Sequence, residues 1–334
     1  MNLLIKTETI TREKKTRSDA IQRLMAFGAL LIIFIGFSLA SPYFFTFRNV
    51  IGILISTAVN GLLAIGVTFI IITGGIDLSV GTVMTLSAVM SGVFITYWNL
   101  PVSLGVMAGI LTGSTAGFFN GILVSKFKLP PFVATLGMLN VARGFSLVIS
   151  KLSPIYFDLD KSVSSIAMGS ILGKIIPGFE IPNAVLIMFG SAIIASLILS
   201  KTILGRYTYA IGSNEKAVRL SGVNIVFWKT AIYTVAGIFI GIAGVVIAAR
   251  LNSAQPSLGL GYELEAIAAA VIGGTSLSGG EGTILGTIIG AFIISTLTNG
   301  LRIMSVPQEW QIVITGFIII FAVYLDILRR GKQS

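Results

Sequence analysis

The chain has 334 residues, of which 54% are apolar and 11% are charged, and its net charge at neutral pH is +10. Soluble domains carry roughly a quarter charged residues, so this composition, with a mean hydropathy of +0.95, indicates an integral membrane protein. Histidine and cysteine are absent, which excludes disulfides, thiolate clusters, cysteine nucleophiles, HExxH metal sites and Ser-His-Asp triads. The basic residues are spread between apolar stretches, so no nucleic-acid partner is expected.

Apolar runs punctuated by Gly, Pro and charge predict an all-α, polytopic membrane fold with about ten transmembrane helices. The segment 263–274 has only 12 residues, too few to cross a hydrocarbon core of ~30 Å as a straight helix, and we expect it to be re-entrant or broken. The predicted spans are 24–41, 50–73, 81–97, 102–124, 132–150, 183–200, 228–249, 263–274, 284–301 and 310–327.

The distribution of positive charge predicts which ends face the cytoplasm. With the N-terminus inside, sixteen Lys and Arg residues fall on the inner side and six on the outer side, as the positive-inside rule expects. Residues 1–23 are then a basic cytoplasmic tail, residues 24–328 the membrane domain, and residues 329–334 a short cytoplasmic tail. A cleaved signal peptide is an alternative for the first segment, but its apolar core is longer than the usual 7 to 15 residues or so.

Two loops stand out between the predicted spans. The outer loop, about 151–182, is rich in proline and acids and could face an extracytoplasmic partner. The inner loop, about 201–228, contains a predicted short helix that Ser213 caps and Gly222 ends, with Glu215 near its positive end. The apolar residues of this helix either insert into a groove on a partner or lie against the same chain or the membrane surface.

Glycines recur every four residues along one predicted span and form a stripe where a neighbouring backbone can approach closely. Packing within one subunit is the simpler interpretation; a seam between subunits or a moving joint is the alternative. The stripe consists of Gly105, Gly109, Gly113, Gly117 and Gly121.

Asp77 lies among glycines between two apolar helices. An acid at membrane depth is costly and is therefore a candidate functional residue. The simpler interpretation is that Asp77 caps the following helix or binds exposed backbone N–H groups. Further polar residues that could hydrogen-bond a passing polyol, or simply join helices, are Asn60, Asn120, Asn140 and Asn299.

Residues Leu277–Glu281 spell LSGGE, which is close to the signature loop of ABC ATPases. The chain has no GxxxxGK[ST] phosphate loop, so it is not expected to bind ATP or to contain catalytic residues. A glycine-rich turn between a short span and the next one explains the run more simply.

Three long runs resemble the permease subunits of ribose-type ABC importers, in the branched-chain amino acid and sugar permease superfamily: residues 72–86, 120–144 and 205–291. The resemblance covers most of the chain from about residue 45. It implies a type II importer-like permease of the bacterial inner membrane that pairs with a second permease subunit, with a homodimer favoured. It also implies a cytoplasmic ATPase with two nucleotide-binding domains and an extracytoplasmic sugar-binding protein that delivers ribose or a related monosaccharide.

In this resemblance ATP and Mg belong to the partner ATPase, and the chain itself holds no cofactor or metal. The resemblance also favours docking as the role of the inner helix, through Ser213, Asn214, Glu215, Ala217, Arg219, Leu220 and Gly222. The alternative function is an ion-coupled secondary sugar carrier that uses Asp77.

Overall fold

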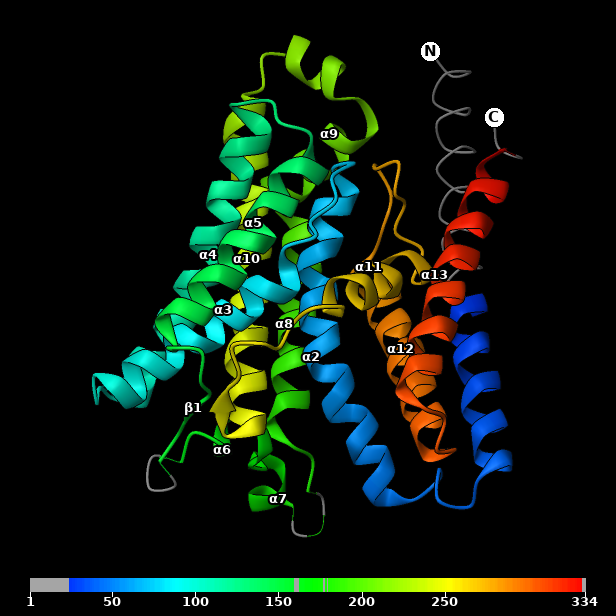
Figure 1. The fold of residues 1–334 in the computed structure, drawn as a ribbon. Coiled ribbons are helices and arrows are strands. Elements are labelled where there is room, and N and C mark those ends of the chain that lie inside the picture. The colour runs from blue at the N-terminus through cyan, green and yellow to red at the C-terminus, as the bar shows by residue number, and fades with distance from the viewer. Residues whose placement is uncertain (1–23, 159–161, 177, 179, 332–334) are drawn as a thin grey trace.

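The computed structural model describes residues 24–158, 162–176, 178 and 180–331 (Figure 1). Apart from one short two-stranded sheet, the regular elements of this part of the chain are helices. They are the helix Leu24–Ala40, α2 (Phe47–Ile72), α3 (Val80–Gly92), the π-helical turn η1 (Val93–Tyr97), α4 (Val102–Ser125), α5 (Pro131–Ile149), β1 (Ile155–Tyr156), α6 (Ser165–Met168), α7 (Ile171–Ile175), α8 (Asn183–Lys201), α9 (Ile203–Leu220), α10 (Ile225–Leu251), β2 (Ser253–Ala254), α11 (Tyr262–Ile272), α12 (Ile284–Ile303) and α13 (Gln308–Gly331).

Within the described residues, seven helical segments are long and apolar enough to cross a membrane: α2, α3 with η1, α4, α5, α8, α10 and α12. The apolar helices Leu24–Ala40 and Gln308–Phe321 are shorter. Helix α11 has 11 residues, which makes it about 16 Å long. A helix therefore lies at each of the predicted spans, but seven of them, rather than ten, meet the length and hydropathy of a span. The expectation that the segment 263–274 is too short to cross straight agrees with α11.

Helices α2 and α10 form the centre of the bundle (Figure 1). Almost every residue from Thr57 to Ile72 in α2 is buried, as is most of the second half of α10. The rings of Phe69 and Phe239 stack between the two helices with centroids 5.8 Å apart. A helix that is apolar on every side is expected to be surrounded by other helices, and α2 has that environment.

The glycine stripe of α4 lies inside the subunit. Gly105 faces Ile95 of η1, and the stripe then follows α3 and α10. A Cβ atom at Gly113 would overlap the backbone of Gly237, and one at Gly117 would overlap the carbonyl of Tyr233. These close contacts require glycine because even a methyl group would force the two helices apart.

Two glycine-rich turns interrupt the bundle, one after α2 and one after α11. Gly74 and Gly274 adopt left-handed conformations with φ of +77° and +97°. The next N–H groups, of Gly75 and Thr275, bond carbonyls five residues earlier, at 3.2 and 2.9 Å. This is the Schellman arrangement that ends a helix, and it allows the chain to turn within the bundle before α3 and α12 begin.

The two predicted loops lie at opposite ends of the molecule (Figure 1). Strand β1 pairs with β2, and with α6 and α7 it forms the end that corresponds to residues 151–182. Asn183 ties this region together, since its side chain accepts from Ile171 N and donates to Ser165 O, both at 2.9 Å. Helix α9 forms the opposite end, within the predicted loop 201–228.

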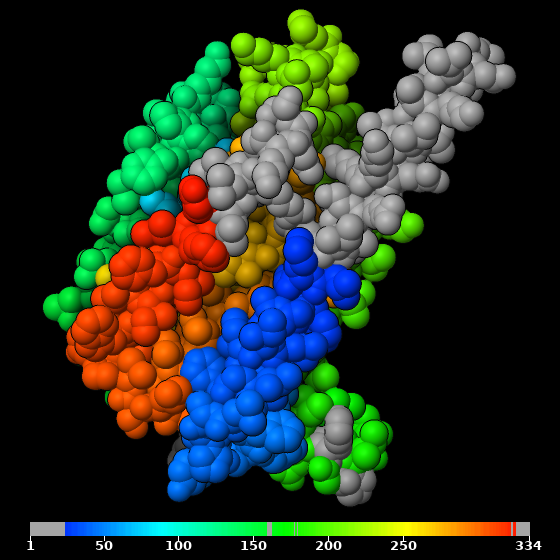
Figure 2. All heavy atoms as spheres, turned by 90° about the vertical axis from the view of Figure 1, so that its right-hand side faces the viewer, coloured from blue at the N-terminus to red at the C-terminus, as the bar shows by residue number. Residues whose placement is uncertain are grey.

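Helix Leu24–Ala40 and α13 lie on one side of the molecule, next to α12 (Figure 2). The N-terminal helix packs on α12 through Phe37, whose ring occupies the place a Cβ atom would take at Gly300. On α13, the side chains of Trp310, Phe317 and Ile320 are exposed. Such an apolar surface is suited to contact with lipid. The predicted tails, residues 1–23 and 332–334, lie outside the described residues.

Candidate functional site

Helix α9 is broken at Asn214, whose backbone has φ −158° and ψ 91°. The Oδ1 atom of Asn214 accepts a hydrogen bond from the N–H of Ala217 at 3.0 Å. Asn214 therefore caps the second segment of the helix, from Glu215 to Leu220. The prediction that Ser213 is the cap was wrong by one residue, because the break falls after Ser213.

Glu215 fixes this short segment to the start of α10. Its carboxylate binds the guanidinium of Arg219 at 2.8 Å and the ammonium of Lys229 at 2.7 Å. Partial burial of the carboxylate opposes its ionisation, but the hydrogen bonds and charges of Lys229 and Arg219 outweigh it and lower the pKa of Glu215. The Arg219 contact lies within the segment, and the Lys229 contact joins the segment to α10.

The outer surface of this segment is open. Leu220 is 88% exposed, and of the seven residues predicted from the sequence for docking six are exposed, whereas Glu215 pairs with Lys229. Gly222, with φ +83°, follows the helix in the left-handed conformation and donates to the carbonyl of Arg219 at 3.1 Å. We call this surface the α9 knob; its exposed residues are Ser213, Asn214, Lys216, Ala217, Arg219, Leu220, Ser221 and Gly222.

The other side of α9 contacts both glycine-rich turns. Gly212 lies so close to the carbonyl of Ile72 that a Cβ atom there would overlap it, and the backbone N of Gly280 is the next nearest atom. The hydroxyl of Tyr209 donates to the carbonyl of Gly282 at 2.8 Å. The LSGGE run is therefore a turn between α11 and α12 that packs beneath the α9 knob.

Asp77 lies in the turn that follows α2, and it is buried. Its Oδ1 atom accepts from the N–H and the hydroxyl of Ser79, at 2.8 and 2.6 Å. The amide of Asn120 donates to Ser79 Oγ at 3.0 Å and reaches Asp77 Oδ2 at 3.4 Å. These are the contacts of an Asx turn that directs the chain into α3, with Asn120 of α4 as its support.

The remaining predicted polar residues do not join Asp77 and Asn120 in one site. Asn60 donates to the carboxylate of Glu265 at 2.7 Å, and Asn299 donates to Asn49 at 2.9 Å. Asn140 is exposed on α5, and its side chain bonds the carbonyl of Leu136 in its own helix. The five residues thus fall into three regions: the turn after α2, the contacts of α2 with α11 and α12, and the outer face of α5.

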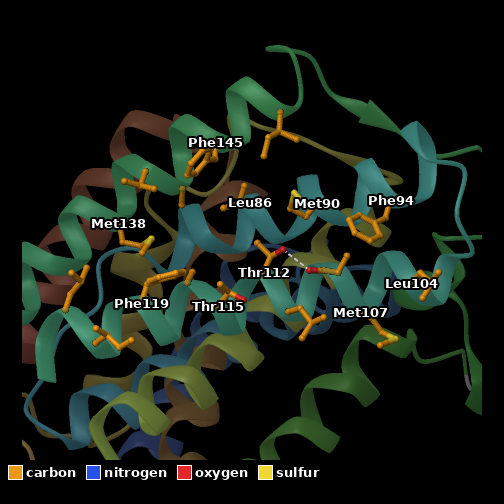
Figure 3. Close-up of a pocket in the computed structure, with 18 of the residues that line it drawn as sticks. Leu86, Met90, Phe94, Leu104, Met107, Thr112, Thr115, Phe119, Met138 and Phe145 are labelled. Carbon is orange, nitrogen blue, oxygen red and sulfur yellow. Dashed lines mark hydrogen bonds between the residues drawn. The ribbon is translucent and has the colours of Figure 1, made fainter. Parts of the chain in front are cut away.

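An apolar groove of about 920 Å³ lies between α3, α4 and α5 (Figure 3). Leu86, Met90 and Phe119 are among the side chains that line it, and Thr112 and Thr115 are its polar members. The hydroxyl of Thr112 already donates to the carbonyl of Ala108 at 2.7 Å. The groove has few free polar groups and is suited to apolar chains rather than to a polar solute.

Comparison with known proteins decides the family. Residues 49–323 match the family described as "Branched-chain amino acid transport system / permease component". The chain belongs to this permease family. The permease is thus a transport component of a membrane and not an enzyme. No solved structure matches the permease.

Relatives of the permease cover almost its whole length. It is 42% identical to the ribose import permease protein RbsC of Bacillus subtilis, over 96% of its own length and 98% of that protein. It is 37% identical to the protein of the same name from Escherichia coli K12, over 96% and 98%. It is also 36% identical to the fructose import permease protein FrcC of Rhizobium meliloti, over 89% and 82%.

Reasoning from the sequence missed three features of the permease. It did not find the Asn60–Glu265 hydrogen bond, because nothing local links residues 205 positions apart. It did not find that Lys229 binds Glu215. It also overlooked the similarity between the turns that begin at Gly74 and Gly274. The sequence carried a signal for it, because in each turn a polar side chain is followed two residues later by a serine. Ser278 N bonds Ser276 Oγ at 3.1 Å, as Ser79 N bonds Asp77.

Proposed function

We propose that this permease is the membrane subunit of an ATP-driven importer that moves a monosaccharide, ribose or a related sugar, across the bacterial inner membrane. A partner ATPase with two nucleotide-binding domains would bind ATP and Mg and hydrolyse the nucleotide, and an extracytoplasmic binding protein would deliver the sugar. The names of the relatives, import permeases for ribose and fructose, support a sugar as the substrate.

The α9 knob is the observation on which this proposal depends. A helical segment with an exposed leucine, joined to the start of α10 by the ion pair of Glu215 and Lys229, suits insertion into a groove on a partner protein. A carrier that works alone would have no use for an exposed apolar knob of this kind.

The contacts of α9 supply a route by which the docked ATPase can act on the membrane helices. When the nucleotide-binding domains close, the knob would move with them. Through Gly212 and Tyr209 this movement would reach the turns after α2 and α11. The permease would then alternate between outward-open and inward-open arrangements without breaking a bond itself.

Positive charge supports a cytoplasmic location for the knob. The α4–α5 connection, with Lys126 and Lys128, lies at the same end as α9, because the hydroxyls of Ser125 and Thr230 are hydrogen-bonded at 3.0 Å. We infer that this end faces the cytoplasm, together with both tails, 1–23 and 329–334. A second copy of the permease is the partner we favour for completing the transport unit.

The proposal is tested by reconstituting the permease in nanodiscs with its ATPase and measuring ATP hydrolysis. Sugar-loaded binding protein is expected to stimulate hydrolysis, and the permease without the ATPase is expected to hydrolyse none. Hydrolysis that does not respond to the binding protein, or an ATPase that fails to associate, would contradict the proposal.

A further inference from the structure

Five polar side chains from four helices lie around the start of α11, and we call them the α11 cluster; among these five described side chains, the direct contact is the hydrogen bond between Asn60 and Glu265. Tyr262 and Glu265 belong to the first turn of α11, Arg250 to the last turn of α10, and Arg302 to the last turn of α12. Asn60, from the middle of α2, donates to Oε2 of Glu265 at 2.7 Å. The members are close enough for the charges of Arg250, Arg302 and Glu265 to act on Tyr262.

The α11 cluster has hydrogen-bonding groups that the described residues do not use. In this part of the chain, Oε1 of Glu265, the hydroxyl of Tyr262 and the guanidinium groups of Arg250 and Arg302 have no hydrogen-bond or ion-pair partner. None of these atoms is among the buried polar atoms without a partner. They therefore retain accessible surface and can still bond a polar molecule, and Arg302 is exposed.

In a purely structural ion network, the carboxylate of Glu265 would pair directly with a cation. Burying a carboxylate is tolerated when a cation pairs with it directly, and no described cation lies within 4.0 Å of Glu265. The second oxygen of Glu265 and the two guanidinium groups are thus available to a ligand, and ionisable residues of transporter helices often mark a substrate path.

The adjoining face of α12 is polar as well. Ser295, Asn299 and Arg302 follow one another at helical spacing, so they share a face. Ser295 is 2% exposed, and its hydroxyl has no partner. Asn299 on the same face bonds Asn49 of α2 at 2.9 Å. Polar groups thus line the α2–α12 side of the bundle, in contrast to the apolar groove on α3, α4 and α5 (Figure 3).

The numbers of acidic and basic side chains at the cluster indicate the net charge of the ligand that it would bind. Glu263 is buried beside Gly261, whose N–H it accepts at 3.1 Å, and its charge also acts on Glu265. The two acids offset the two arginines, so the cluster favours a neutral molecule over an anion or a cation. Carboxylate oxygens accept from hydroxyl groups, guanidinium groups donate to hydroxyl oxygens, and a tyrosine ring can cover an apolar C–H face. A monosaccharide presents all three surfaces.

The position of the cluster fits a molecule in transit. The ends of α10 and α12 that carry Arg250 and Arg302 lie away from α9, on the side of β1 and β2 (Figure 1). Helix α11 is too short to span the membrane, and transporters build substrate sites where such interrupted helices begin. A sugar released at the end opposite the α9 knob would meet the cluster before it reached the two turns beneath α9.

We propose that the α11 cluster binds the sugar during translocation, with Glu265 as the principal acceptor of sugar hydroxyls and Arg302 as a donor. This inference rests on the proposed import function and names the residues that contact its substrate. Asn60 is a positioning residue, because its hydrogen bond orients the carboxylate of Glu265.

The test compares Glu265→Gln with Glu309→Gln, a control on the exposed start of α13. Both variants are reconstituted in proteoliposomes with the ATPase and binding protein. Uptake of labelled ribose, fructose and xylose is measured together with ATP hydrolysis and thermal unfolding. Glutamine has nearly the shape of glutamate but is a weaker acceptor, and hydrogen bonds to charged groups are worth roughly ten- to hundredfold in an equilibrium. We expect Glu265→Gln to reduce uptake about tenfold or more and to change the ratio of the three sugars, while its thermal unfolding matches that of Glu309→Gln.

Unchanged uptake and sugar ratio in Glu265→Gln would overturn the inference. If Glu265→Gln loses uptake and stability together, the Arg302→Gln variant decides. Transport of all three sugars by Arg302→Gln at the wild-type level would then also overturn the inference. Reduced uptake with an altered sugar ratio in Arg302→Gln supports the inference independently of the folding of Glu265→Gln. A wild-type complex that imports no sugar would instead contradict the importer function itself.

Discussion

Gly280 donates its backbone N–H to the carbonyl oxygen of Ile72 across 2.8 Å. This hydrogen bond joins the turn after α11 to the last residue of α2, and Gly212 of α9 packs against the same carbonyl. The two interrupted segments and the helix that carries the α9 knob therefore meet at one point. A displacement of α9 cannot leave the turns where they are, which gives the permease a direct mechanical link between its surface and its centre.

The first prediction concerns Gly212. A Cβ atom in Gly212→Ala would overlap the carbonyl of Ile72 and press on Gly280, and both neighbours are backbone that cannot rotate away. Overpacking of this kind costs about 1–3 kcal/mol. We expect a lower unfolding temperature in detergent and a loss of most sugar uptake. The matched control is Gly144→Ala on α5, where a Cβ atom would meet open space; equal behaviour of the two variants would refute the contact.

The second prediction concerns the α9 knob. Leu220→Asp should leave folding intact, because Leu220 is 88% exposed. It should weaken binding of the ATPase at least tenfold, since burying a leucine contributes about 1.5–3 kcal/mol and burying a carboxylate is unfavourable. Ala217→Glu is expected to act in the same way. The measurement is co-purification of the ATPase with the permease.

Leu152→Asp is the control for this experiment, because Leu152 is 75% exposed but lies in the connection between α5 and β1. It is expected to bind the ATPase normally. If the ATPase co-purifies normally with Leu220→Asp, the proposal that the α9 knob docks the ATPase is contradicted.

The third prediction concerns pH. The pKa of Glu215 is lowered from its ordinary value of 4.5 by Lys229 and Arg219, although partial burial opposes this. A carboxylate with a lowered pKa stabilises the fold above its unfolded-state pKa, and that stabilisation is lost as the pH falls through the folded-state value. Glu215→Gln should therefore lower stability by up to about 1 kcal/mol at neutral pH.

Thermal unfolding of the two proteins from neutral to acidic pH checks this sign. The curves of Glu215→Gln and the wild type should converge once the pH drops below 4.5 toward the folded-state pKa. A difference that grows on acidification would show that the ion pairs do not hold the knob.

The fourth prediction separates a turn-forming Asp77 from an ion-coupling one. In Asp77→Asn the side-chain oxygen can still accept from Ser79 N, and a flip of the Asn120 amide, whose Nδ2 now faces Asp77 Oδ2, would turn its unpartnered Oδ1 toward the new donor. We expect this variant to fold and to import sugar, whereas Asp77→Ala should be less stable and less active. Uptake that disappears in Asp77→Asn while the fold persists would favour the ion-coupled carrier instead.

Local features of the sequence predicted the helices and the α9 knob. Apolar runs are long enough to locate the helices at the ten predicted spans, although not α6, α7 or the first part of α9. Asn214, Glu215 and Gly222 carry cap, dipole and terminator signals within ten residues. The break at Asn214 was misplaced at Ser213 because both residue types cap helices well. The preceding helical segment, Ile203–Ser213, is amphipathic and polar enough to have passed for a loop.

Long-range partners could not be predicted in the same way. The spacing of Gly105 to Gly121 defines one face of a helix, but it does not say which helix covers that face. The structure supplies the answer in Gly237 and Gly241 of α10. For Glu265, the sequence gives an acid in a short helix, and only the packing of α2 against α11 brings Asn60 to it.

The most direct test of the whole account is uptake of labelled ribose into proteoliposomes that contain the permease, with each partner omitted in turn. The account predicts that uptake requires the ATPase, the binding protein and ATP together, and that a proton or sodium gradient has no effect. Uptake by the permease alone, driven by an ion gradient, would contradict it.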